Sequence, residues 1–201
     1  DTVDQIWKQL KTLAETGDGF IRTSQVEEAG ISRPMLKKYV DRGKLERVRK
    51  GIYVLSDGFT DEYVLLQAQS SKALFSYGTA LFLWGMSDRT PHIIDVTVPH
   101  GTNMTVVRRD NPNLRCHYVQ PELYELGITE TRSPQGGMVR LYDRERCICD
   151  LVRDKEQIEM QLYSQAINDY FRTKPNSRKL LKYSKAFRIE EKIRTYMEVL
   201  L

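Results

Sequence analysis

The first part of the chain alternates between segments with helical spacing of apolar residues and short breaks that contain glycine. Across residues 3–15, apolar side chains recur three and four positions apart, which predicts an amphipathic helix. Gly17-Asp18-Gly19 follows, and glycine tolerates the left-handed backbone that a helix end requires. Phe20-Ile21 then has the character of a short extended segment. We therefore expect a helix, a turn and a short strand in this order.

A second, shorter helix is predicted directly after this extended segment. Thr23 is placed where an N-cap belongs, and Gly30 supplies the stop. Between them, Val26 and Ala29 are spaced so that both face the interior. We expect this helix to be only about two turns long.

A third helix is predicted to begin after Ser32, its expected N-cap. Pro34 falls in the first turn, where a missing backbone N–H has no cost. At about 100° per residue, Leu36, Tyr39 and Val40 gather on one side of the helix. The opposite arc is mostly cationic and contains Arg33, Lys37, Lys38, Asp41 and Arg42. One face is therefore expected to be core and the other to be a charged surface.

Two predicted strands, at residues 45–48 and 52–55, flank the basic turn Arg49-Lys50-Gly51. Three helices followed by a β-hairpin is the order of a winged helix-turn-helix, whose third helix enters the DNA major groove. We therefore predict a DNA-binding domain at residues 1–57, with a winged helix used only for protein contacts as the alternative. The predicted DNA contacts are Ser32, Arg33, Lys37, Lys38 and Arg42 on the helix, and Arg47, Arg49 and Lys50 on the wing.

Residues 58–201 are expected to form a larger domain in which helices flank a sheet. Helices are predicted at 61–74 and 78–85. Short runs rich in β-branched or aromatic residues predict strands at 93–98, 104–108, 115–119, 127–132 and 138–142. Residues 133–137 suit a hairpin connection between the last two strands. The expected fold class is α+β, with a small, mainly antiparallel sheet and a helical C-terminal tail.

The chain is predicted to be helical from residue 143 onward, with breaks near 153–156 and 173–176. One helix of the tail has an apolar side made of Leu180, Tyr183, Ser184 and Phe187. Its other side carries Arg178, Lys179, Lys182 and Lys185. A later apolar stripe is rotated by about 150° from the first, so we expect a break near Phe187–Arg188. The basic side is a candidate second surface for DNA or an acidic partner, and a solvated, solubilising face is the alternative.

Composition and length favour a soluble globular chain. The 201 residues suit one medium domain plus a small module, and the hydrophobic and charged fractions are 40% and 29%. No apolar run exceeds residues 80–84, far short of the roughly 18–20 residues that span a bilayer. The start of the chain has no leader-like pattern, and three cysteines make no disulfide framework. We therefore expect a cytoplasmic protein.

The net charge of +4 is unevenly distributed along the chain. Residues 1–57 carry +2, residues 58–171 carry −4 and residues 172–201 carry +6, while residues 32–50 alone carry +6. Two basic stretches around an acidic middle indicate a phosphate-backbone ligand more strongly than the overall charge does. Solvated faces of ordinary helices are the alternative explanation.

The motifs that would indicate an enzyme are absent from the sequence. It has no GxxxxGK loop, no GxSxG elbow and no HExxH. It also lacks the Asp-x-Asp pair with which nucleotidyltransferases hold Mg²⁺. After Asp95, the only acidic-x-Lys triplet that would suggest a nuclease is the distant Glu190-Glu191-Lys192. We predict no catalytic residues and no cofactor.

No metal site is predicted either. Cys147 and Cys149 would point about 200° apart on a helix, so they do not readily share one ion, although Cys116 and His117 make a site conceivable. The three histidines have no evident carboxylate partner and are interpreted as structural or surface groups: His92, His100 and His117. Arg144-Glu145-Arg146 is interpreted as a surface or intersegment ion-pair cluster.

Residues 43–53 resemble the wing of the AbiEi-type antitoxins of bacterial abortive-infection systems. Further segments similar to that family are residues 79–91, 142–146, 150–153 and 180–201. The resemblance spans nearly the whole chain, although Cys147 and Cys149 depart from the family pattern. It implies a winged helix that represses its own operon. It also implies a C-terminal domain, here residues 58–201, that counteracts a nucleotidyltransferase-like toxin encoded beside it.

The resemblance and the charge pattern together predict a cytoplasmic antitoxin and transcriptional autorepressor of a type IV toxin–antitoxin system, which would act in phage resistance. Its expected partners are double-stranded operator DNA with inverted repeats, a second copy of the chain on that DNA, and the cognate toxin. Two alternatives are open. One is a winged-helix regulator with a ligand-sensing C-terminal domain and no toxin, and the other is a DNA-processing enzyme with an unrecognised active site.

Overall fold

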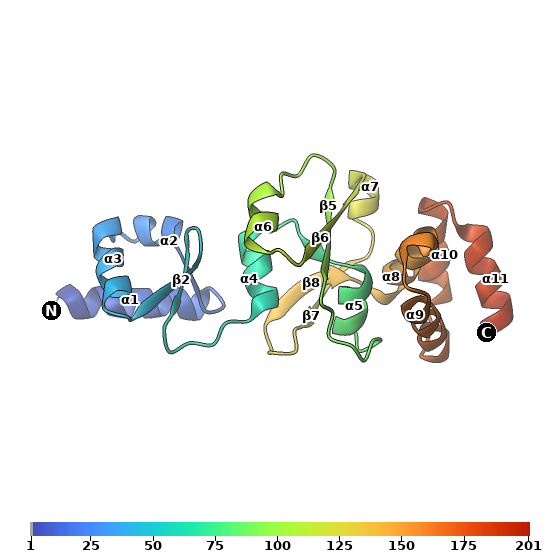
Figure 1. Cartoon of the computed structure of the whole chain (residues 1–201), viewed down its shortest axis with the longest axis horizontal. Helices are drawn as coiled ribbons and strands as arrows, with labels where there is room; N and C mark the ends of the chain where they lie inside the picture. The colour runs from blue at the N-terminus through green and yellow to red at the C-terminus, as the bar shows by residue number, and fades with distance from the viewer. Residues whose placement is uncertain (1) are drawn as a thin grey trace. The chain divides into compact units, whose positions relative to one another are not determined.

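The computed structural model describes residues 2–201 and shows two compact units (Figure 1). The first unit contains the chain up to Ser70 together with Gln135–Gly137. The second unit contains Ser71–Pro134 and Met138–Leu201. Helices and strands are mixed along the chain, and the α+β class expected from the sequence is confirmed.

The first unit combines helices with a three-stranded antiparallel sheet of order β1-β3-β2. Its elements are α1 (Thr2–Thr16), β1 (Phe20–Arg22), α2 (Thr23–Glu28), α3 (Arg33–Asp41), β2 (Leu45–Arg49), β3 (Ile52–Leu55) and α4 (Glu62–Gln69). The core between α1, α2, α3 and the sheet contains Leu10, Ile21, Val26, Ile31, Leu36 and Leu45, each at most 4% exposed. Apolar residues whose spacing predicted these helices and strands therefore form this core.

The second helix differs from its prediction in its N-cap and in the burial of Ala29, whereas Gly30, with φ 80°, does follow its C-cap as the predicted stop. Its N-cap is Arg22 rather than Thr23, because Arg22 still has extended backbone in β1 while Thr23 is the first helical residue. Ala29 is exposed instead of facing the interior. The helix ends at Glu28, so Ala29 is already its C-cap, and Ile31 fills the core position at 4% exposure.

The second unit contains a five-stranded sheet of order β6-β5-β4-β8-β7. Its strands are β4 (Leu74–Phe75), β5 (Ile94–Pro99), β6 (Leu114–Val119), β7 (Ile128–Arg132) and β8 (Met138–Tyr142). The short helices between them are α5 (Tyr77–Leu83), α6 (Thr105–Asp110) and α7 (Pro121–Tyr124). β4 pairs antiparallel with β5, and β7 with β8, but β4 is parallel to β8 and β5 to β6. The sheet is therefore mixed rather than mainly antiparallel.

Two segments of the chain after the hairpin have a different structure from the predicted one. The helix expected over 61–74 ends at Gln69, and Leu74–Phe75 form the central strand β4, fully buried. Periodicity does not separate a short buried strand from a buried piece of helix. The strand expected over 104–108 is helix α6 instead. Because β5 and β6 are parallel, the chain must cross over between them, and α6 lies in that connection.

The chain from residue 144 onward is helical, as expected. Its elements are α8 (Arg144–Arg153), the 3-10 turn η1 (Lys155–Gln157), α9 (Met160–Arg172), α10 (Ser177–Ala186) and α11 (Glu190–Leu200). The predicted break near Phe187–Arg188 is confirmed, with Arg188 at φ 59° between α10 and α11. Across the described chain, none of the helices is both long and apolar enough to span a bilayer.

Candidate nucleic-acid interface

Helix α3 is anchored on one face and charged on the other. The Ser32 hydroxyl accepts a hydrogen bond from the Met35 N–H at 3.3 Å, which confirms Ser32 as the N-cap. Tyr39 is buried, stacks on Trp7 with ring centroids 5.4 Å apart, and donates from its hydroxyl to the Val3 carbonyl. Lys37, Lys38 and Arg42 are all exposed. The core contacts therefore fix the rotation of α3 and leave a basic face in solvent.

The hairpin formed by β2 and β3 places a second set of cations in solvent. Arg47 and Lys50 are exposed, whereas Arg49 is half-buried and its Nη1 donates to the Val48 carbonyl at 2.7 Å. The hairpin turn is tied to the start of α2, because the Thr23 N–H donates to the Gly51 carbonyl at 3.0 Å. Arg47 and Lys50 therefore extend more fully into solvent than Arg49 does.

Arg33, the first residue of α3, contacts the preceding helix. Its Nε donates to Glu27 Oε1 at 2.9 Å, and the two side chains are 75% and 49% exposed. Arg33 is a predicted DNA contact, and its pairing with Glu27 is not evident from the sequence. The two residues belong to different helices, so their approach depends on the angle between α2 and α3.

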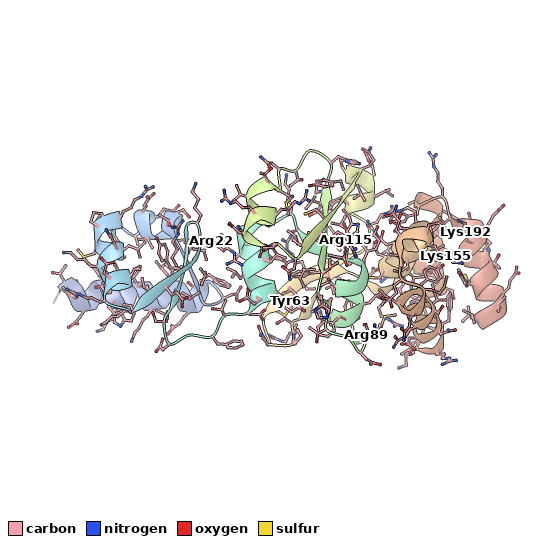
Figure 2. All side chains as sticks on the ribbon, in the orientation of Figure 1. Arg22, Tyr63, Arg89, Arg115, Lys155 and Lys192 are labelled. Carbon is pink, nitrogen blue, oxygen red and sulfur yellow. The ribbon has the colours of Figure 1, made fainter. Side chains whose placement is uncertain are left out.

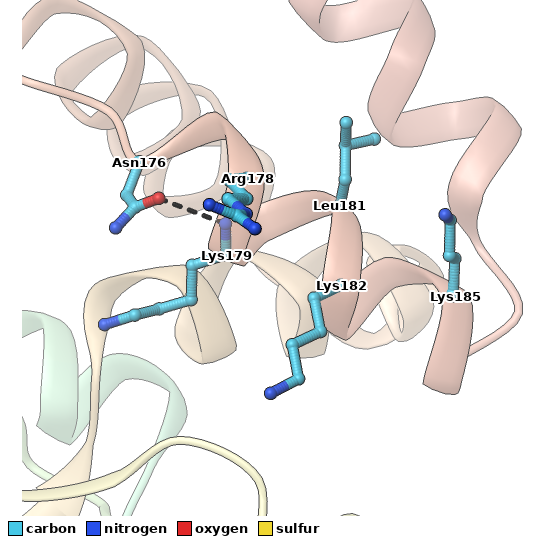
Figure 3. A pocket seen from close by; sticks show the side chains of 6 residues that line it. All are labelled: Asn176, Arg178, Lys179, Leu181, Lys182 and Lys185. Atoms are coloured by element: carbon cyan, nitrogen blue, oxygen red, sulfur yellow. Dashed lines mark hydrogen bonds between the residues drawn. The ribbon is translucent and has the colours of Figure 1, made fainter.

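The basic side of α10 lines a shallow hollow of the second unit (Figure 3). The Asn176 side chain caps the helix by accepting the Lys179 N–H at 3.0 Å, and Lys179 and Lys182 extend to one side of it (Figure 3). The Lys179 ammonium lies 3.5 Å from Asp143 and 3.7 Å from Glu145. Arg178, Lys182 and Lys185 are exposed. Lys179 is thus held by acidic neighbours on α8 and its N-cap, and the other three cations form the accessible basic surface.

A polar cluster that is not predicted from the sequence lies on β5 and β6. Asp95 has a side chain only 4% exposed, and its Oδ1 lies 2.7 Å from Arg115 Nε and 2.8 Å from His117 Nε2. The expectation that His117 lacks a carboxylate partner is therefore wrong. Parallel pairing of β5 with β6 places the two strands side by side, and Figure 2 labels Arg115 there. His117 also stacks on the Tyr77 ring, with centroids 4.0 Å apart.

Tyr77 is buried and has the uncommon backbone φ of 49° at the start of α5. Its hydroxyl donates to Asp154 and accepts from Arg153 Nη2 at 3.0 Å. Burial first, and then the nearby Asp150 carboxylate, raises the pKa of the Tyr77 phenol well above its ordinary value. Tyr77 is therefore a neutral link between α5 and the end of α8, not an acid–base group near neutral pH.

Arg146 also lies elsewhere than expected. It is fully buried, so the surface form of the predicted cluster is wrong for this residue, and its guanidinium lies over the rings of Tyr142 and Phe187 at 3.9 and 4.6 Å. The intersegment form holds for Glu145, which pairs with Lys179 of α10. Cys147 and Cys149 are buried on the same helix, and burial raises the pKa of both thiols. Within residues 2–201, no three His, Cys, Asp or Glu side chains gather in a way that would hold a metal ion.

Comparison with known proteins connects this geometry to one family. Residues 8–56 match the family model described as "Transcriptional regulator, AbiEi antitoxin". The match runs from within α1 to the end of the hairpin and confirms the resemblance to AbiEi antitoxins over this part of the chain, which does not include the similar segments after residue 56. No curated protein matches the chain.

A similar fold is found in the crystal structure of the RV2827C protein from Mycobacterium tuberculosis. The TM-score is 0.62 at 13% sequence identity, and the similarity covers 88% of this chain and 69% of that one. The fold similarity to this structure therefore covers most of the chain, including residues outside the segment that the family model matches. At this identity the similarity concerns the fold alone.

Proposed function

We propose that this protein is an antitoxin and transcriptional autorepressor. Residues 1–57 would form a winged helix that binds inverted-repeat operator DNA, and residues 58–201 would counteract a nucleotidyltransferase-like toxin. The observation that carries the proposal is that the family match over residues 8–56 coincides with the elements that present cations on α3 and the hairpin turn.

In this proposal α3 enters the major groove and the hairpin follows the phosphate backbone. Lys37, Lys38 and Arg42 lie on the exposed face of α3. On the hairpin, Arg47 and Lys50 reach phosphates directly, and the half-buried Arg49 supports the turn. The capped N-terminus of α3 at Ser32 adds backbone N–H groups near the DNA. Two copies on one inverted repeat would place two such helices in successive major grooves.

Binding to operator DNA is tested by titrating the upstream region of the gene with the full-length protein at several salt concentrations. Lys37→Ala/Lys50→Ala should weaken binding and reduce the slope of log K against log salt by about 0.9 for each lost phosphate contact. Lys72→Ala/Lys192→Ala, which removes two exposed charges from the second unit, is the matched control and should bind like the wild type. An unchanged salt slope in the double variant would contradict the assignment of these two residues.

The antitoxin role is tested by growth. The neighbouring reading frame should encode a nucleotidyltransferase, and its expression should arrest growth unless the full-length protein is co-expressed. A protein with an intact first unit that represses transcription but gives no protection would support the alternative of a regulator without a toxin. Ligand-dependent release from the operator would support the ligand-sensing form of that alternative. Cleavage of DNA, or nucleotide transfer, by the pure protein would support the enzyme alternative.

A further inference from the structure

The ion pair between Arg33 and Glu27 lies at the end of α3 that the proposed function directs toward base edges. The residues near the N-terminus of a recognition helix are those that contact bases in the major groove. Arg33 is the first residue of α3, and its side chain is 75% exposed even though its Nε is bonded to Glu27. An exposed pair of this kind contributes little to stability, because solvent screens it. Its position suggests another role.

The geometry of the pair leaves one edge of the guanidinium available. An arginine side chain offers five N–H donors in a rigid planar fork. Glu27 accepts from Nε at 2.9 Å, and this bond leaves the donors of the two terminal nitrogens, Nη1 and Nη2, for other acceptors. A pair of parallel terminal N–H donors is complementary to O6 and N7 of guanine, the commonest specific arginine contact in the major groove.

We propose that Arg33 reads a guanine in each operator half-site through Nη1 and Nη2, and that Glu27 is the positioning residue that holds it in the reading orientation. This inference rests on the proposed DNA-binding function and adds the base that is recognised. Glu27 has a further effect, because its negative charge lies beside the DNA surface and opposes phosphate binding. It therefore lowers affinity for all sequences and raises discrimination between them.

The roles of the other cations differ from that of Arg33. Lys37 and Lys50 are exposed single charges on a flexible stem, which suits phosphate contacts rather than planar recognition of a base. Removing one of them should weaken binding to all sequences by a similar factor. Removing Arg33 should instead relax the preference at one base pair of each half-site.

The test is selection of binding sites from a random duplex library by the full-length wild-type protein, followed by titration of labelled duplexes that differ only at the selected guanine. The wild type should prefer guanine by roughly ten- to a hundredfold. Arg33→Ala should remove most of that preference, and Arg33→Lys should not restore it, since an ammonium lacks the planar fork. Lys37→Ala should weaken binding and keep the preference.

Glu27→Gln tests whether Glu27 positions Arg33 or acts on DNA only through its negative charge. It should raise affinity for non-specific duplexes and lower the preference for guanine, two changes of opposite sign. Glu28→Gln is the matched control, because it removes an equal charge from the neighbouring exposed residue of α2. It should raise affinity and leave the preference unchanged.

Three outcomes overturn the inference, and they differ from one another. If the wild type selects no sequence and binds no duplex, both the proposed function and this inference fail. If the wild type selects a site but Arg33→Ala keeps the wild-type base preference, DNA binding stands and the assignment to Arg33 fails. If Glu27→Gln and Glu28→Gln behave alike, Glu27 is not the positioning residue.

Discussion

Arg146 joins several elements of the second unit. It is fully buried, and its Nη1 donates to the carbonyls of Leu123 and Leu126, while its Nε donates to Asp150 Oδ1 at 3.2 Å. A buried guanidinium requires these partners, because an unpaired charge in the interior is strongly unfavourable. It therefore connects α8 to the segment around α7 and lies against the ring of Phe187 at the end of α10.

Replacing Arg146 with Met should destabilise the protein by about 3–5 kcal/mol, because Asp150 would keep only Arg153 as a counterion. Burial already raises the pKa of Asp150, and Arg146 opposes that rise, so the variant should raise it further. A carboxyl with a raised folded pKa costs stability at neutral pH and costs none below its unfolded pKa. The defect measured by urea unfolding should therefore shrink as the pH falls from 7 toward 4.

The control for this prediction is Arg146→Met/Asp150→Asn, which also removes the stranded carboxylate. It should recover part of the lost stability at pH 7 and show a weaker pH dependence than the single variant. Equal stability of Arg146→Met and the wild type at pH 7 would contradict the structural role given to this residue.

The three cysteines should differ in reactivity. Cys147 and Cys149 are buried with raised thiol pKa values, so little thiolate forms at neutral pH and reagents have no access to it. Burial also raises the pKa of the Cys116 thiol, but Cys116 is only half-buried and is therefore more accessible than the other two. A thiol reagent should therefore modify one cysteine, and slowly, in the native protein, and three in denaturant. Rapid modification of three in the native protein would mean that α8 is not packed as described.

Contacts between residues close together in the sequence could be predicted, whereas contacts between separate helices or strands could not. Ser32 was predicted as a cap because the bond it makes spans three residues. The pairs Asp95–His117 and Glu27–Arg33 were not predicted, because each depends on how two elements approach one another. The sequence predicts Arg146 to be in a surface or intersegment ion-pair cluster, and its burial does not follow from local pattern, because only the packing around α8 provides its partners.

At the scale of elements, the cap of α3 links stability to the proposed interface. Ser32→Ala should cost about 1 kcal/mol in unfolding free energy, because the Met35 N–H loses its acceptor. The same change should weaken operator binding, since the first turn of α3 carries Arg33. Thermal unfolding and DNA titration of one preparation measure both effects.

Ser32→Asp separates the two effects. Aspartate is also a good N-cap, so stability should stay near that of the wild type. Its negative charge at the DNA-facing end of α3 should still weaken binding. If Ser32→Asp binds operator as tightly as the wild type does, the N-terminus of α3 does not face DNA.

Helices and strands were predicted well where the apolar pattern extends over many residues and poorly where it extends over only a few. The amphipathic helices α1 and α3 were predicted with their stops, because several independent signals agree in each. Residues 104–108 were predicted as a strand from a brief β-branched run, yet the crossover between parallel β5 and β6 makes this segment the start of helix α6. The parallel pairing of β5 with β6 therefore determines the structure of this segment, and the local sequence pattern does not encode that pairing.

At the scale of the whole molecule, charge is segregated between segments of the chain. The net +4 conceals +6 over residues 32–50 and +6 over residues 172–201, with an acidic stretch between them. The first basic stretch lies on α3 and the hairpin, and much of the second lies on α10. Because one basic stretch belongs to the first unit and the other to the second, we expect two separable electrostatic interactions.

Charge reversal on α10 tests whether its basic surface serves the antitoxin role or DNA binding. Lys182→Glu/Lys185→Glu changes two exposed residues and should leave the fold intact, because the opposite side of α10 supplies its buried contacts. If the surface meets an acidic toxin, this variant should lose protection in the growth assay and keep wild-type operator affinity. Lys72→Glu, an exposed site elsewhere in the second unit, should keep both activities. Loss of operator affinity with protection retained would assign the α10 surface to DNA, and retention of both would leave it as a solvated face.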